Sequence, residues 1–238
     1  MQSHRLLPLL LFALLSPACV IDVDDHDHRH HWDDSGHRRP GLWGDACAVD
    51  HQCAAGLVCF SGTCEPERVG LYVHGALVAP GRADGREWDA DYELPPSVWV
   101  DLGDARRAGV GALFDFMDWV ARSGISAPDV FGFGYLALDG VWDERQTLDL
   151  GSTRPDAFEA IWSRPAGWTD VPLHEGLWVG VDLFDEDWDG DESIGMVTID
   201  AWGLREALHR GGVVWFDTYE VTEGQLLLVG IEVVSESW

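Results

Sequence analysis

Residues 177–199, LWVGVDLFDEDWDGDESIGMVTI, hold seven carboxylates, most of them between two apolar segments. Apolar residues alternate in the first segment, so every second side chain lies on one face, as in a half-buried β-strand. The side chains on this face are Leu177, Val179, Val181 and Leu183. A second strand is predicted over residues 194–199. The stretch therefore predicts two strands joined by an acidic loop.

The same period of two recurs from Arg68 onward. Further strands are expected at residues 68–78, 97–102, 133–138, 158–162, 212–218 and 225–234. The shared face of residues 97–102 would carry Val98, Val100 and Leu102. Helical spacing of apolar residues predicts helices over residues 111–122 and 201–209. About eight strands across residues 68–235 predict an all-β fold, an antiparallel sandwich or barrel, with a partly helical insertion at about 104–151.

The composition excludes several classes of function. The chain has 238 residues, a formal net charge of -27, and arginine as its only basic residue apart from histidine. Without lysine there is no P-loop lysine and no Schiff base, and without asparagine there are no N-linked glycans. The negative charge repels nucleic acid and attracts cations and basic partners. We therefore expect no nucleic-acid partner.

The first 18 residues have the form of a secretory signal peptide, with a cationic start, a short apolar run and small residues near the cut. The end of this segment resembles the lipobox of bacterial lipoproteins, in which the cysteine after the cut is lipidated. The resemblance implies lipidation of Cys19 and a place in the cell envelope, as an outer-membrane lipoprotein. Ser16 stands where that family usually has leucine, and the same residues also suit an ordinary signal peptidase, which would give a plain secreted protein.

Residues 19–43 are predicted to be a tether, because residues 20–41 hold five histidines and six aspartates and almost nothing that could form a core. Imidazole and carboxylate groups suit zinc, copper or nickel, so a metal-binding tether is one interpretation. Irregular histidine spacing on a flexible chain leaves no fixed geometry, which favours a spacer.

Residues 44–66 form a small module with four cysteines: Cys47, Cys53, Cys59 and Cys64. Such a density in an exported chain predicts two disulfides, because the piece is too small to fold by its core. A zinc site with four thiolates would call for close CxxC pairs, which are absent here. Sequence alone permits three pairings. The pattern resembles knot-like modules in exported proteins of myxobacteria and their relatives, and this resemblance implies the pairs Cys47–Cys59 and Cys53–Cys64.

In the acidic loop, Asp185, Asp187 and Asp189 alternate and Gly190 follows. Clustered carboxylates on a tight loop are typical of calcium sites, since calcium is a hard cation that takes about six to eight oxygen ligands. The start also fits an EF-hand, but that loop needs a bidentate glutamate at its twelfth position, where this chain has Met196. The flanking segments are predicted strands rather than helices, so the EF-hand interpretation is excluded.

The stretch of residues 177–199 resembles the third loop of a C2 domain. A second match lies in GREWDADYELPPSVWVDL, residues 85–102, which resembles the first C2 loop, and EGQLLLVGIEVV, residues 223–234, is similar to a closing strand. The resemblance implies a C2-like antiparallel β-sandwich over residues 68–235, with calcium as cofactor. The implied ligands are Asp89, Asp185, Asp187 and Asp191. Further candidate ligands are Asp84, Asp91, Asp189 and Glu192. The chain has Pro96 where the family has another aspartate, so the alternative is a sandwich whose acidic loop binds no ion tightly.

No nucleophile elbow, zinc-binding helix, Walker loop or dinucleotide fingerprint occurs in the sequence, so we expect no catalytic residues and no enzyme. Trp188 in the acidic loop would either enter a lipid interface or fold back on the protein. The expected function is a lipid-anchored calcium-binding module at the cell surface that binds phospholipid or an envelope protein through its calcium loops. The alternative is a structural lipoprotein in which calcium only stiffens the loops.

Overall fold

A computed structural model describes residues 40–90, 92–139, 141–142, 146–187, 190–218 and 225–236. The chain divides into two compact units, Met1–Arg39 and Pro40–Trp238, and all described residues belong to the second. Several features predicted from the sequence lie outside the described residues: the signal peptide, most of the tether, Cys19, Asp91, Trp188 and Asp189.

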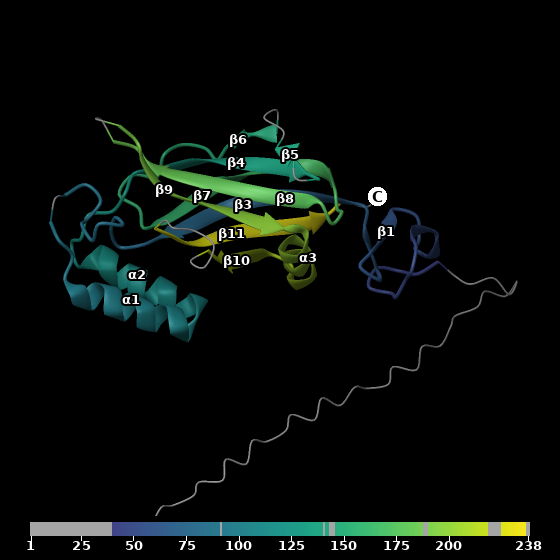
Figure 1. The fold of residues 1–238 in the computed structure, drawn as a ribbon, viewed down its shortest axis with the longest axis horizontal. Coiled ribbons are helices and arrows are strands. Elements are labelled where there is room, and N and C mark those ends of the chain that lie inside the picture. Colours follow the sequence, from purple (N-terminus) through teal and green to yellow (C-terminus); the bar gives the residue numbers. More distant parts are fainter. Residues whose placement is uncertain are drawn as a thin grey trace, which may run out of the picture. The chain divides into compact units, whose positions relative to one another are not determined.

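Two antiparallel sheets lie face to face and form the body of the second unit (Figure 1). The first sheet has the order β10 (Val213–Asp217), β11 (Leu226–Ser235), β3 (Arg68–Val78) and β7 (Glu159–Pro172). The second has the order β5 (Val141–Trp142), β4 (Val130–Leu138), β8 (Leu177–Asp185) and β9 (Glu192–Asp200), and β6 (Leu148–Asp149) also pairs with β4. Each of these strand pairs is antiparallel. The predicted all-β class is confirmed.

The core fills the space between the sheets, and the alternation in the sequence accounts for it. All four apolar side chains predicted for one face of β8 are fully buried. They belong to the same cluster as Leu71 and Leu77 of β3 and Ile231 of β11, on the other sheet. Complete burial of one such side chain stabilises the fold by about 1.5 to 3 kcal/mol. Burial between two sheets therefore fixes the register of β8, since a shift by one residue would turn its apolar face outward.

One predicted strand is wrong, because residues 97–102 lie in helix α1 (Pro96–Ala108). Val98 and Leu102 are buried, while Val100 between them is 62% exposed. The apolar spacing 98, 102 and 105 is helical, and Ala105 packs against the core. The short apolar run of residues 97–102 fits both the strand period of two and the helical period. Pro96 in the first turn favours the helix, because the N–H that proline lacks has no hydrogen-bond partner at that position of a helix.

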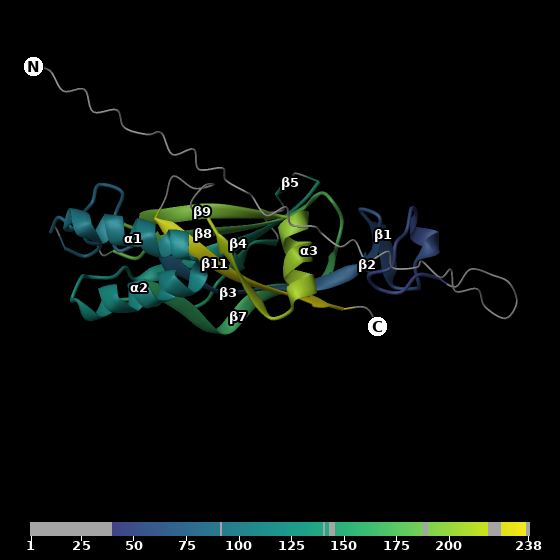
Figure 2. The same ribbon diagram turned by 90° about the horizontal axis from the view of Figure 1, so that it is seen from below.

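The inserted segment also differs in extent from the prediction of residues 104–151. Helices α1 and α2 (Val110–Arg122) follow β3, and the sheet resumes at Val130 with β4, which pairs along its length with β8. The helices lie at one end of the sandwich (Figure 2). The other predicted strands and helices are present, including α3 (Ala201–Arg210), but β7 continues to Pro172, ten residues beyond the predicted end of its strand.

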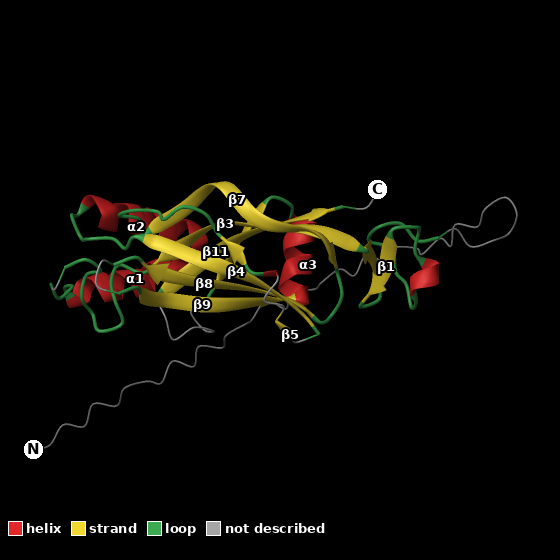
Figure 3. Ribbon diagram, turned by 90° about the horizontal axis from the view of Figure 1, so that it is seen from above, coloured by secondary structure: helices red, strands yellow, loops and turns green. Residues whose placement is uncertain are grey.

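The cysteine module contains a short 3-10 helix, η1 (Asp50–Gln52), and a hairpin of β1 (Leu57–Phe60) and β2 (Thr63–Pro66). Its disulfides join Cys47 to Cys59 and Cys53 to Cys64, with S–S distances of 2.08 and 2.07 Å. The pairing that the family resemblance implied is confirmed, and all four thiols are used in disulfides. The module lies at the end of the sandwich away from α1 and α2, next to α3 (Figure 3).

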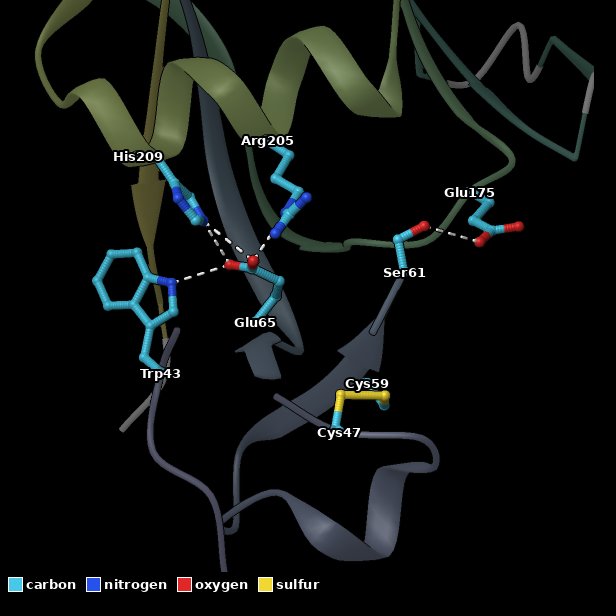
Figure 4. Close-up of polar contacts among 8 residues, drawn as sticks. All are labelled: Trp43, Cys47, Cys59, Ser61, Glu65, Glu175, Arg205 and His209. Carbon is cyan, nitrogen blue, oxygen red and sulfur yellow. Dashed lines mark hydrogen bonds and ion pairs between the residues drawn. A yellow bond between two sulfur atoms is a disulfide. The ribbon is translucent and has the colours of Figure 1, made fainter. Parts of the chain in front are cut away.

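A buried glutamate joins the module to the sandwich (Figure 4). Glu65 in β2 is fully buried, and Arg205 Nε in α3 donates to its Oε1 at 2.7 Å. His209 Nε2, also in α3, lies 2.8 Å from Oε2, and the Trp43 indole N–H donates to Oε2 at 2.9 Å. Phe60 of the module belongs to the main core cluster. The module is therefore packed against the sandwich and is not a freely moving spacer.

Candidate metal centre

Three aspartates from two separate parts of the chain meet at one end of the sandwich. Asp185 is the last residue of β8, Asp187 follows in the β8–β9 connection, and Asp89 lies in the β3–α1 connection. One carboxylate oxygen from each lies within 4.8 Å of the other two. Three of the four ligands that the C2 resemblance implies are thus side by side.

The position of Asp89 depends on the tryptophan before it. Trp88 is 2% exposed, and its indole N–H donates to the Ala79 carbonyl oxygen at 3.0 Å. A buried indole that also satisfies a backbone carbonyl fixes the connection at this point. The Asp89 N–H donates to Ser126 Oγ at 3.2 Å, which leaves the carboxylate of Asp89 at the exposed rim of the group.

Asp185 is the buried member of the group, with 0% of the residue exposed. Its Oδ1 accepts the Asp129 N–H at 2.7 Å, and its buried Oδ2 has no hydrogen-bond partner within the described part of the chain. Burial raises the pKa of Asp185 to about 7, the charges of Asp187, Asp89 and Asp129 add to that effect, and the Asp129 N–H opposes it. Buried oxygens without a donor are rare in native proteins, so the orphaned Oδ2 calls for a cation or a proton.

Two further carboxylates, those of Asp129 and Asp156, add negative charge near the site, and neither was predicted from the sequence. The pKa of Asp89 is raised by partial burial, then by the charges of Asp129, Asp187 and Asp156, while Arg82 opposes the shift. Asp129 lies directly before β4, and its Oδ1 accepts the Asp156 N–H at 2.8 Å. Val130 pairs with Asp185 across the sheet, which brings Asp129 to the site. Asp129 therefore reaches Asp185 because β4 lies next to β8 in the sheet, and the sequence alone does not predict which strands are neighbours.

The other candidate ligands lie elsewhere or are used differently. Asp84 Oδ1 accepts the Arg86 N–H at 3.1 Å in its own turn. Glu192 lies 3.3 Å from Arg82 Nη1. Asp191 is exposed and does not join the three-carboxylate group found among the described residues. At Pro96 the chain begins a helix, so the expected first-loop carboxylate has no counterpart in this geometry.

The ligand atoms of the group are all carboxylate oxygens, which hard cations prefer over the softer transition metals. Asp89 is exposed and Asp185 is buried, so a cation here would have one face toward solvent, where water or a ligand oxygen completes its shell. Irregular placement on a strand end and two connections favours calcium over magnesium, because magnesium demands a near-ideal octahedron. The described residues therefore fit calcium.

Comparison of the sequence with protein-family models and with curated proteins gives no match. The fold is similar to the calcium-bound pair of C2 domains of extended synaptotagmin 2, at 16% identity and a TM-score of 0.38, covering 70% of this chain and 45% of that chain. It is similar to a C2 domain of plant extended synaptotagmin 1, at 10% identity and a TM-score of 0.39, covering 72% and 95%. It is also similar to human GIVD cytosolic phospholipase A2, at 14% identity and a TM-score of 0.38, covering 71% and 17%.

The chain spans less than half the length of the extended synaptotagmin 2 chain. Likenesses this distant carry no conclusion about what the protein binds. In the described part of the chain, no helix is both long enough and apolar enough to cross a membrane.

Proposed function

We propose that the protein is exported, is anchored by a lipid on Cys19 in the outer membrane, and acts there as a non-enzymatic calcium-binding module. Calcium would be held by Asp89, Asp185 and Asp187, with Asp129 as a neighbouring charge. The observation that carries the proposal is the fully buried Asp185 carboxylate, which lies beside two other carboxylates and whose Oδ2 has no hydrogen-bond partner among the described residues.

Electrostatics supports a bound cation at neutral pH. Carboxylates within a few ångströms of one another repel, and burial makes that repulsion stronger than it would be in water. A divalent cation would neutralise the group and link the β3–α1 connection to the end of β8. Extracellular calcium modules work at about 10⁻⁴ to 10⁻³ M, so this site would stay filled in a calcium-rich medium, and the proposed role is constitutive.

The proposed partner is a phospholipid surface or an envelope protein that contacts the calcium loops. Tyr92, three residues after Asp89 in the same connection, is 73% exposed. Tyrosine and tryptophan rings are favoured at lipid interfaces because one end is apolar and the other polar. An exposed ring in the connection that carries Asp89 supports lipid contact, and Trp188 is the residue expected to play the same part in the β8–β9 connection. The alternative is a structural role, in which calcium stiffens the loops and no partner binds there.

Calorimetric titration of the chain without its signal peptide, carrying Cys19→Ser, tests the calcium site. We expect calcium uptake with a dissociation constant of about 10⁻⁴ to 10⁻³ M, and none after Asp185→Asn combined with Asp187→Asn. The matched control is Asp101→Asn combined with Asp104→Asn, which removes the same charge from exposed positions of α1. Absence of uptake by the wild type at millimolar calcium would contradict the site.

Sedimentation with phosphatidylethanolamine and phosphatidylglycerol vesicles separates the two roles. Co-sedimentation in calcium but not in EDTA, lost on Tyr92→Ser, supports lipid binding. If calcium binds and no vesicles are taken up, the proposed lipid partner is wrong, and protein contact or loop stiffening remains.

A further inference from the structure

The outward face of the sheet formed by β5, β4, β8 and β9 carries a cluster of aromatic rings. Along β4, residues 130, 132, 134 and 136 are buried, whereas Phe131, Phe133 and Tyr135 are half-buried on the other face. Phe184 of β8 lies opposite Phe131, with ring centroids 5.4 Å apart and planes inclined by 28°. Phe133 meets these two rings edge-on, at 6.1 and 6.3 Å. The three phenyl rings form a continuous ridge, which we call the phenyl ridge.

A carboxylate stands beside the phenyl ridge. Asp182 lies directly opposite Phe133 on β4 and Met196 on β9, and two residues before Phe184 on the same face of β8. Asp182 is half-buried, and no hydrogen bond or positive charge from a described residue lowers its pKa. Tyr135 lies diagonally from Asp182 on the same face of the sheet. Burial raises the pKa of Asp182, and burial followed by the charge of Asp182 raises the pKa of Tyr135. A cationic partner would offset the desolvation of this half-buried carboxylate.

We propose that the phenyl ridge and Asp182 bind an arginine side chain from a basic segment of another protein. A guanidinium group is planar and weakly hydrated, stacks on aromatic faces and pairs with a carboxylate through two parallel hydrogen bonds. Phe131 and Phe184 stack on each other and Phe133 meets both edge-on, so the three rings form an open ridge and not a cage. A flat cation fits such a ridge better than a spherical quaternary ammonium group, which needs rings on several sides.

Charge on the whole molecule favours the same partner. The net charge of -27 attracts basic proteins at long range, and the ridge would supply local specificity. The face is separate from the metal centre: Asp182 is half-buried on the outward face, whereas Asp185 is fully buried at the end of the strand. Binding in EDTA would therefore show that this surface acts independently of calcium.

The test uses the chain without its signal peptide, carrying Cys19→Ser, with both disulfides formed, in EDTA and about 0.15 M salt to screen diffuse attraction. Calorimetry measures binding of the peptide acetyl-Gly-Arg-Gly-Arg-Gly-amide and of its lysine counterpart, and amide NMR shifts locate the contact. We expect the arginine peptide to bind about tenfold tighter than the lysine peptide, with shifts confined to β4, β8 and β9. Asp182→Asn should weaken binding about tenfold.

Two further variants keep the test decisive. Phe133→Leu keeps apolar bulk but removes a ring face, and it should also weaken arginine binding. Asp101→Asn removes one exposed charge on α1 and should leave binding unchanged. The proposal is overturned if Asp182→Asn and Asp101→Asn behave alike, since attraction would then be diffuse, or if choline chloride produces the shifts and the arginine peptide does not.

Discussion

At the scale of single residues, the chemistry of the metal centre depends most on Asp185. One of its oxygens accepts the Asp129 N–H, and the other has no partner among the described residues. Without a cation, the group is most stable with a proton, which is why its pKa is raised to about 7. A calcium ion at Oδ2 would compete with that proton. Calcium uptake near neutral pH should therefore release protons.

The free energy of unfolding in EDTA should fall as the pH rises from about 4 to 7. The pKa of Asp185 is higher in the folded chain, about 7, than its ordinary value of 3.8, so the folded state binds the proton more tightly. The proton on Asp185 stabilises the folded state by roughly 4 kcal/mol in total. This stabilisation is fully present below the pKa of Asp185 in the unfolded chain, and it is lost as the pH rises through the pKa of Asp185 in the folded chain. Urea unfolding at pH 5 and pH 7.5 measures the difference.

In the same experiment, Asp185→Asn should remove most of the pH dependence of the unfolding free energy. Adding calcium to the wild-type protein at pH 7.5 should restore the stability that it has at pH 5. Equal unfolding free energies at the two pH values in EDTA would show that Asp185 is not desolvated as described.

Trp88→Phe should weaken both the fold and calcium binding. The change keeps a buried ring but leaves the Ala79 carbonyl without its donor, which costs about 1 to 3 kcal/mol. Because Asp89 follows directly, its carboxylate would be held less firmly. Urea unfolding and calcium titration measure the two effects. Trp119→Phe is the control, since Trp119 is half-exposed on α2 and should change neither quantity measurably.

Sequence patterns predicted the residues of the site better than its surroundings. Asp89, Asp185 and Asp187 stand in motifs that a local reading can match, and the structure brings them together. Asp129 and Asp156 carry no comparable local pattern, and they reach the site only because β4 pairs with β8. Long-range pairing of strands is what the sequence alone could not supply.

At the scale of elements, α1 shows how a short apolar run misleads. Alternation of Val98, Val100 and Leu102 fits a strand, but the same residues also provide the i and i+4 positions of a helix. Residues 103–108 contribute no further alternation, and Ala105 extends the helical stripe onto the core. Strand β8 was predicted nearly in full because its alternation continues over eight residues, which has no helical equivalent, whereas only the first residues of the longer β7 were predicted.

Alanine substitutions at Val98 and Val100 should have opposite effects on stability. Val98 is 3% exposed, so Val98→Ala should lower the free energy of unfolding by about 1 to 2 kcal/mol. Val100 is exposed, so Val100→Ala should be neutral or slightly stabilising, because alanine is the better helix former. Chemical denaturation of both variants checks this. Equal losses would instead support the strand that the alternation predicted, in which both side chains share one face.

At the scale of the whole molecule, Glu65 determines whether the cysteine module and the sandwich unfold together. Glu65→Ala should lower the free energy of unfolding by about 2 to 3 kcal/mol, less than for a fully buried ion pair because Arg205 and His209 remain partly exposed. Limited proteolysis should then release the module first. Glu175→Ala removes a single exposed contact to Ser61 and should cost less than about 0.5 kcal/mol. Similar losses in both variants would contradict the buried junction.

The sequence predicted the cysteine module and the sandwich, but it did not predict that the two pack against each other. The disulfide pattern and the period of two identified the module and the sandwich separately. Nothing local marks Glu65 as buried, since a glutamate in a short exported module reads as a surface residue. Its partners lie 140 and 144 residues later in α3, a separation that only the folded chain closes.

Strand β3 gives the molecule a mechanical property. It leads directly from the cysteine module to the connection that holds Asp89, and it is hydrogen-bonded to β11 on one side and β7 on the other. A force pulling between the module and a ligand held at the metal centre would run along this strand. Its hydrogen bonds lie across that direction, so they would be sheared together and not peeled one at a time. The protein should therefore resist stretching between these two ends better than stretching across its sheets.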